Sequence, residues 1–85
     1  MFDFIASSDF VENLNALDLD TQARIKEKLR FFTAQENPLL HAKRLKGYKN
    51  IFRFRVGDFR IVFNQIKKTI ILLKVKHRKD IYEKL

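Results

Sequence analysis

Three arginines, Arg53, Arg55 and Arg60, occupy positions from which they could bind one phosphate together. They lie in two consecutive segments in which apolar and polar residues alternate, separated by a turn that contains a glycine. Alternate side chains of a strand point to opposite faces, and residues paired across a hairpin lie about 5 Å apart. The spacing therefore predicts three guanidinium groups on one sheet face, where a bound anion would relieve their repulsion. An ordinary solvated sheet face is the alternative.

A second group of chemically useful residues follows the last predicted strand. His77, Arg78 and Tyr82 stand close together in the sequence and offer an imidazole, a guanidinium and a phenol. These groups can transfer a proton near neutral pH, bind phosphate and stack on a base. Together with the arginines they indicate RNA or single-stranded nucleic acid as a partner.

The positive charge is concentrated in the C-terminal part of the chain. The formal charge is +8, from 18 Lys and Arg against 10 Asp and Glu. Residues 1–36 hold four basic and seven acidic side chains (−3), whereas residues 37–85 hold fourteen basic and three acidic ones (+11). A localised positive surface attracts and steers polyanions. A basic surface that is merely solvated is again the alternative.

Several kinds of site are excluded by the residues that the sequence lacks. The chain has no cysteine, which rules out disulfides, a thiolate nucleophile and a cysteine zinc site. His41 and His77 are far apart in the sequence without an acidic cluster nearby, and the two glycines form no phosphate-binding loop. We therefore expect no metal and no cofactor, and any catalysis is expected to be acid–base chemistry assisted by cations.

The length and hydrophobicity indicate one folded domain, residues 1–85. The chain is 46% hydrophobic with nine Phe, which suits a small but dense core. Its longest apolar run, residues 70–73, is far shorter than the roughly 20 residues of a membrane span, and its first residues do not resemble a signal peptide. A cytoplasmic protein is the expectation.

The periodicity of apolar residues predicts an α+β fold. The predicted elements are a strand at 2–6, a helix at 8–17, a helix from Asp18 or Asp20 to just before Pro38, strands at 51–56, 59–64 and 69–76, and a tail at 80–85 that forms a helical turn or frays. We expect two antiparallel helices packed on one face of a small, mainly antiparallel four-stranded sheet.

Strict alternation in the last predicted strand separates its residues into two sets. One set is Ile71, Leu73 and Val75, and the other is Ile70, Leu72, Lys74 and Lys76. His77 has the parity of Val75.

Three segments together resemble a known family. They are Leu45-Lys46-Gly47-Tyr48, the run from Phe52 to Phe63, and His77-Arg78-Lys79-Asp80-Ile81-Tyr82. They resemble the RelE branch of the RelE/ParE toxin superfamily, and the likeness extends over nearly the whole chain. The last segment favours the RelE branch over the ParE branch.

The resemblance implies the toxin of a type II toxin–antitoxin pair, which enters the ribosomal A site and cuts the messenger RNA there. A ribose 2′-hydroxyl attacks the adjacent phosphate and the 5′-oxygen leaves, without a metal ion. This chemistry needs a base, cations and an acid. The resemblance also implies a cognate antitoxin encoded next to the toxin, and a toxin–antitoxin hetero-oligomer.

The resemblance also assigns roles to residues of this chain. Arg53 and Arg55 match basic positions that are often lysine in the family, and Arg60 matches a phosphate-binding arginine. Arg78 matches an arginine on the leaving-group side, and Tyr82 a tyrosine that stacks on a base or assists proton transfer. The lysines expected to add RNA-binding surface are Lys43, Lys46, Lys74, Lys76 and Lys79.

Arginine at the first two positions departs from the family pattern. A guanidinium does not deprotonate in proteins, so Arg53 and Arg55 can bind phosphate but cannot act as a general base. His77 is then the best candidate for proton transfer, because imidazole has a reference pKa near 6.5. The alternative is that His77 ends its strand with its ring on the core side.

Two other functions stay open at the level of the sequence. A ParE-like protein would inhibit DNA gyrase with the same fold and no nuclease activity. A non-catalytic RNA-binding module would keep the basic surface alone.

Overall fold

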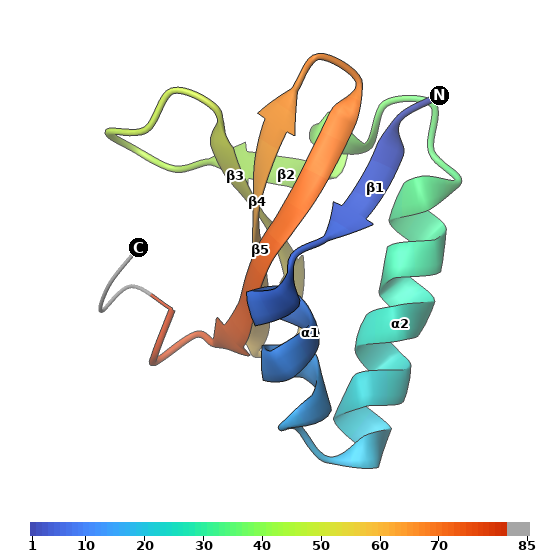
Figure 1. Ribbon diagram of the computed structural model, residues 1–85, viewed down its shortest axis with the longest axis vertical. Coiled ribbons are helices and arrows are strands. Elements are labelled where there is room, and N and C mark those ends of the chain that lie inside the picture. The colour runs from blue at the N-terminus through green and yellow to red at the C-terminus, as the bar shows by residue number, and fades with distance from the viewer. Residues whose placement is uncertain (82–85) are drawn as a thin grey trace.

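The computed structural model describes residues 1–81 (Figure 1). Its elements are β1 (Asp3–Ala6), α1 (Ser8–Asn15), α2 (Leu19–Thr33), the 3-10 helix η1 (Pro38–His41), β2 (Ala42–Arg44), β3 (Ile51–Val56), β4 (Phe59–Ile66) and β5 (Thr69–His77). Within residues 1–81 the five strands form one sheet in the order β1-β5-β4-β3-β2. β1 runs parallel to β5, and the other neighbours are antiparallel. The predicted α+β class, with both helices on one face, is confirmed.

The sheet of the described chain has five strands and not the predicted four, because β2 adds to the edge of β3. β2 has three residues, and Ala42, Lys43 and Arg44 pair with Phe54, Arg53 and Phe52. Three residues are too few to show an alternating pattern, so the pairing with β3, not the local sequence, defines this strand.

Both helices begin at the expected capping residues. The Phe10 N–H donates to Ser7 Oγ at 3.1 Å at the start of α1. At the start of α2, the Asp18 carboxylate accepts from the hydroxyl and the N–H of Thr21, and these bonds lower the pKa of Asp18. In the described part of the chain, neither helix is long and apolar enough to cross a membrane.

Stacked phenylalanines form the centre of the core between the helices and the sheet. Phe54 of β3 is fully buried, and its ring stacks on Phe32 of α2 with centroids 4.0 Å apart. On β4, Phe63 stacks on Phe54 at 4.5 Å. Phe10 and Leu14 of α1 complete this cluster, so both helices are anchored on the same sheet face.

The strict alternation predicted for β5 is wrong, because a β-bulge interrupts this strand. Val62 pairs with Lys74, but the next residue, Phe63, pairs with Leu72, so Leu73 is an extra residue. The bulge reverses the parity, which lets Ile70 and Leu72 join Val75 in the core while Lys74 and Lys76 stay on the opposite face.

Side chains of the α1 region bind the backbone groups at this bulge. Ser7 Oγ donates to the Leu73 carbonyl at 3.2 Å, and Asn13 Oδ1 accepts from the Val75 N–H at 3.3 Å. The Ser7 N–H also donates to the Leu72 carbonyl at 2.9 Å. The bulge is therefore stabilised by a segment at the other end of the chain.

Each of the two hairpin turns contains one residue with a positive φ, a glycine in one turn and a lysine in the other. Gly57 has φ 58° in the β3–β4 turn, as expected for a glycine at a two-residue turn, whereas Lys67 adopts φ 54° in the β4–β5 turn. A positive φ costs about 1–2 kcal/mol for a residue with a Cβ, and glycine adopts it without that cost.

We therefore expect Lys67→Gly to raise the free energy of unfolding by up to about 1 kcal/mol, because relief of the left-handed strain exceeds the entropy lost by glycine. Gly57→Ala should lower it by about 1 kcal/mol, since an added Cβ meets Arg24 Nη1 at an ordinary 3.8 Å and the cost comes from the backbone alone. Urea denaturation of both variants measures these changes. Destabilisation by Lys67→Gly would contradict the expectation.

Candidate functional site

The sheet carries its cationic residues on the face opposite the helices. Arg53 and Arg55 alternate along β3 with the buried residues Phe54 and Val56, so they point away from the core. The strand register arranges the cationic residues in two rows across the sheet. One row is Arg55-Arg60-Lys76, and the other is Lys43-Arg53-Val62-Lys74, in which Val62 is the one apolar member. The structure thus brings Arg53, Arg55 and Arg60 together on one face.

Four of these residues and a histidine enclose a cavity of about 200 Å³, which we call the arginine cleft. Its lining residues are His41, Lys43, Arg53, Arg55 and Arg60. Cavities that hold drug-sized ligands have volumes of about 300–1,000 Å³. The arginine cleft is therefore suited to a phosphodiester group and part of its sugar.

Arg60 is held at the centre of the positive charge. Its Nη1 donates to the carbonyl oxygens of Gly57 at 2.9 Å and Phe59 at 3.0 Å, which orients the half-buried side chain. Burial lowers the pKa of Arg60, and the positive charges of Arg55, Arg53 and Arg78 lower that pKa further. The lowered pKa indicates repulsion within the cluster, and an anion bound there would relieve it.

Arg78 lies beside this cluster at the end of β5. Its N–H donates to the Asp58 carbonyl at 2.7 Å, so the backbone after β5 is attached to the β3–β4 turn. The Nε of Arg78 lies 3.8 Å from Asp58 Oδ1, and both side chains are more than half exposed. An exposed ion pair of this length contributes little stability, which leaves the guanidinium available to an anion.

His77 does not join the arginines. It pairs with Phe59, and its ring meets the Phe59 ring edge-on at 5.5 Å, on the side of the sheet that packs against the helices. Its Nδ1 accepts from the Lys79 N–H at 3.2 Å. A role for His77 as general base stays a prediction, and the position of its ring gives that role no support.

Three of the five predicted RNA-binding lysines lie on the arginine face, and the other two lie in separate segments outside it. Lys43, Lys74 and Lys76 share the arginine face through the strand register. Lys79 is exposed after β5, while Lys46 is exposed in the loop between β2 and β3, at the end of β3 away from Arg55. Tyr82 and most of the predicted tail, 80–85, lie outside the described residues.

His41 is a residue of the arginine cleft that the sequence patterns did not single out. It is the last residue of η1, directly before β2, and no periodic pattern in the sequence marks this position. Within residues 1–81 no group of three or more His, Asp or Glu could hold a metal ion.

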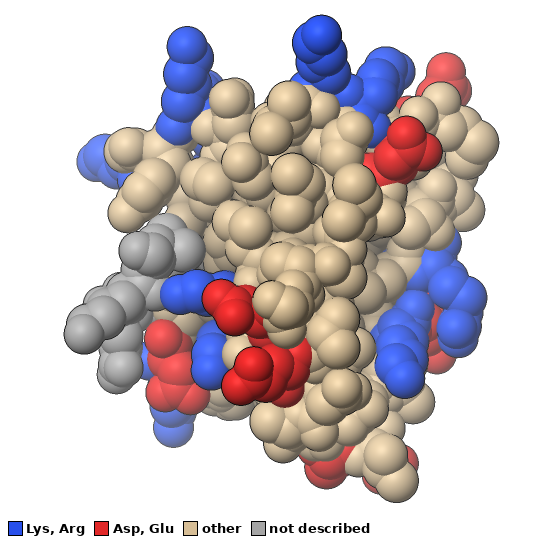
Figure 2. Space-filling model, in the orientation of Figure 1, with Lys and Arg blue, Asp and Glu red and all other residues tan. Residues whose placement is uncertain are grey.

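An apolar area borders the cationic residues. Figure 2 shows one side of the molecule, where uncharged atoms extend over the upper parts of β1 and β5 and most Lys and Arg lie at the margins. Ile5 of β1 is exposed and pairs with Ile71 of β5, on the sheet face opposite the core. Ile66 of β4 is also exposed near the β4–β5 turn.

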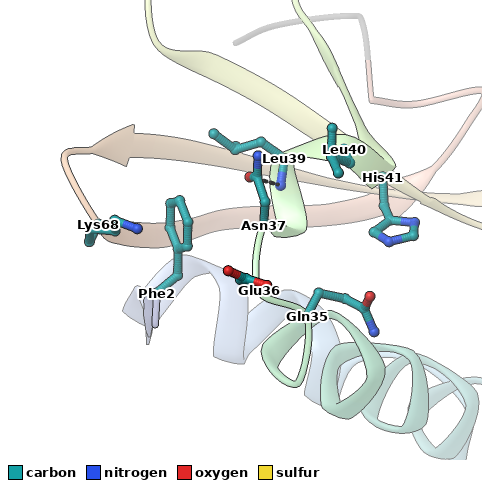
Figure 3. Close-up of a pocket in the computed structure, with 8 residues that line it drawn as sticks. All are labelled: Phe2, Gln35, Glu36, Asn37, Leu39, Leu40, His41 and Lys68. Atoms are coloured by element: carbon teal, nitrogen blue, oxygen red, sulfur yellow. Dashed lines mark hydrogen bonds between the residues drawn. The ribbon is translucent and has the colours of Figure 1, made fainter.

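A second cavity, of about 450 Å³, lies between the start of β1, the β4–β5 turn and η1 (Figure 3). Figure 3 shows Phe2 and Lys68 at one end of it and Gln35 and His41 at the other. Near its middle, Asn37 Oδ1 accepts from the Leu39 N–H at 3.2 Å. His41 therefore borders both this cavity and the arginine cleft.

Two helices packed on one face of a mixed five-stranded sheet form the fold that this chain shares with an antitoxin–toxin complex of known structure. A family model described as the ParE toxin of type II toxin–antitoxin systems (parDE) matches residues 4–82. The chain therefore belongs to this toxin family, which confirms the RelE/ParE resemblance of the sequence.

The proteins similar to this chain include RelE toxins. Toxin RelE3 of Methanocaldococcus jannaschii is 36% identical over 77 residues, which cover 87% of this chain and 88% of that protein. A chain of the RelB–RelE antitoxin–toxin complex from Methanococcus jannaschii is 32% identical, with a TM-score of 0.77 over 95% of this chain and 98% of that one. The RelBE2 complex of Mycobacterium tuberculosis has the same TM-score at 22% identity, over 91% and 98%, and shows the fold alone.

If the arginine cleft binds phosphate, Arg60→Gln should weaken binding of a short single-stranded RNA about 10- to 100-fold, because it removes charge-assisted hydrogen bonds. Fluorescence anisotropy at fixed salt measures the affinity, and thermal unfolding checks the fold. Arg30→Gln removes the same charge from an exposed position on α2 and is the matched control. Equal losses in the two variants would show that only net charge matters.

Proposed function

We propose that this toxin is an endoribonuclease that cuts messenger RNA in the ribosomal A site. The observation that carries the proposal is the arginine cleft, in which Arg53, Arg55 and Arg60 converge with Lys43. The RelE relatives at 36% and 32% identity support the RelE branch and not a gyrase inhibitor.

In the proposed reaction the ribose 2′-oxygen attacks the adjacent phosphorus. A bond forms between the 2′-oxygen and phosphorus, and the bond from phosphorus to the 5′-oxygen breaks. The products are a 2′,3′-cyclic phosphate and a free 5′-hydroxyl. Arg53, Arg55 and Arg60 stabilise the negative charge that builds up on the phosphate oxygens, so the reaction takes its positive charge from guanidinium groups and not from a metal ion.

The remaining roles surround this phosphate. We assign Arg78 to the 5′-oxygen side, supported by its proximity to Arg60 and its exposed guanidinium. Tyr82 keeps the role that the family resemblance implies, stacking on a base or assisting proton transfer. Lys43, Lys74 and Lys76, with Lys46 and Lys79 farther out, contribute attraction to the RNA backbone.

The proposed partner in the cell is the translating ribosome, which assigns the protein to the cytoplasm. The open rows of cationic residues suit the phosphates of messenger and ribosomal RNA. No cofactor enters the proposed reaction.

A second proposed partner is an acidic antitoxin encoded next to this gene, which forms a hetero-oligomer with the toxin. Support comes from the RelB–RelE antitoxin–toxin complex of Methanococcus jannaschii, one chain of which is 32% identical to this chain. On this chain, the cationic rows border the apolar area at Ile5, Ile66 and Ile71, so a segment with both acidic and apolar residues fits the surface.

The proposed function predicts new message ends in a reconstituted translation reaction that contains the purified toxin. Primer extension should detect cuts that need the ribosome. Arg78→Ala and Tyr82→Phe should each reduce cutting at least tenfold, because both residues are assigned to the reaction. The melting temperature of Arg78→Ala should change by only a few degrees, because the Arg78 side chain is exposed. Arg30→Gln is the control, because it removes one positive charge from an exposed position outside the arginine cleft.

Other outcomes of that reaction assign other functions. DNA breaks that depend on gyrase, with intact message, would support a ParE-like inhibitor and contradict the proposal. Binding of RNA without any cut would leave a non-catalytic RNA-binding module.

The proposed antitoxin should co-purify with the toxin when the adjacent gene is co-expressed, and it should block cutting. Because apolar residues contribute to the surface, the complex should persist at about 1 M salt, where the Debye length is about 3 Å. Size-exclusion chromatography at low and high salt measures this. Dissociation at high salt would show that the contact is electrostatic alone.

A further inference from the structure

The proposed reaction needs a group that takes the proton from the 2′-hydroxyl, and this inference rests on that proposed function. The guanidinium groups of Arg53, Arg55 and Arg60 stay protonated and cannot accept it. The ring of His77 lies on the helix side of the sheet against Phe59. Because His77 does not line the arginine cleft, a base at the cleft comes from a residue that does.

His41 is the histidine among the residues that line the arginine cleft. It directly precedes β2, in which Ala42 pairs with Phe54 and Lys43 with Arg53. His41 is the last residue of η1, one position before the first paired residue, Ala42. The pairing of β2 with β3 thus carries the histidine to the arginines.

Aromatic packing fixes the position of the His41 ring. Phe31 of α2 meets it edge-on with centroids 5.2 Å apart, and Phe32 lies at 6.0 Å. Phe32 is itself buried and stacked on Phe54, at the centre of the core. The imidazole is therefore supported on one side by the core, while the residue as a whole is exposed to solvent.

Charged groups surround this histidine from several elements. They are Lys43 on β2, Arg53 and Arg55 on β3, Arg60 on β4, and, around the neighbouring cavity, Glu36 after α2 and Lys68 in the β4–β5 turn. The four that line the arginine cleft are cations that can bind a phosphate. Glu36 and Lys68 line only the neighbouring cavity.

We propose that His41 is the proton-transfer residue of the arginine cleft. The neutral imidazole takes the proton of the 2′-hydroxyl as the 2′-oxygen forms its bond to phosphorus. The bond from phosphorus to the 5′-oxygen breaks, and its electron pair stays on the 5′-oxygen, which takes a proton from water. The protonated imidazole then returns its proton to solvent.

The test compares His41→Gln with His77→Gln in single-turnover cutting on the ribosome, from about pH 5.5 to 8.5. The wild-type rate should rise with pH and then level off, because only the neutral form of the imidazole can accept the proton. His41→Gln should cut about 100-fold more slowly or worse, without that rise, while its affinity for RNA changes by less than about threefold. His77→Gln should retain the rise.

The outcomes separate this inference from the function on which it rests. Wild-type protein that cuts no message on the ribosome overturns the proposed function and the role of His41 together. Wild-type cutting with an unchanged rate or an unchanged pH profile in His41→Gln overturns the role of His41 alone. Loss of the rise in His77→Gln only would return the role to His77.

A measurement without catalysis tests the position of the ring. Inorganic phosphate is added to the wild-type protein at constant pH, and the imidazole signals of both histidines are followed by NMR. The His41 signals should move with phosphate concentration more than those of His77. Static His41 signals while the arginine signals move would contradict its place in the arginine cleft.

Discussion

The stacking of Phe54 between Phe32 and Phe63 is the interaction on which the rest of this structure depends. Phe54 is fully buried and stands between Arg53 and Arg55 on β3. A register slip by one residue would expose the aromatic stack and turn two guanidinium groups into the core. Both changes would lower the stability of the fold, since apolar burial is lost and charge is buried. The packing that stabilises the fold therefore also determines which face carries the arginines.

The crowded cations are accommodated by contacts with the backbone and by the shape of β5. Arg60 donates to two carbonyl oxygens of the β3–β4 turn region, which fixes its guanidinium without a carboxylate partner among the bonds described. The bulge at Leu73 lets β5 give Ile70, Leu72 and Val75 to the core and still present Lys74 and Lys76 beside the arginines. A regular strand could not satisfy both demands, because its side chains alternate without exception.

The choice of arginine on β3 has a chemical consequence for a toxin of this family. Lysine often stands at the positions of Arg53 and Arg55 in RelE-like proteins, and an ammonium group can lose its proton when its surroundings favour the neutral form. Two guanidinium groups bind phosphate more firmly through paired hydrogen bonds but leave proton transfer to a different side chain. In the proposed reaction, the phosphate is therefore bound by residues of β3 and β4, while the proton is taken by a residue of η1.

The sequence by itself determined the two helices, the β3–β4 hairpin and the shared face of Arg53, Arg55 and Arg60, because each depends on a local period of apolar residues. Only the tertiary structure decided the fifth strand, the bulge and the place of His41. β2 is too short to carry a period and exists through its pairing with β3. The bulge is bonded by Ser7 and Asn13, which lie 66 and 62 positions away from their partners in the chain. Contacts between such distant segments leave no periodic signal in either one, so the site residues that depend on them become visible only when the chain is folded.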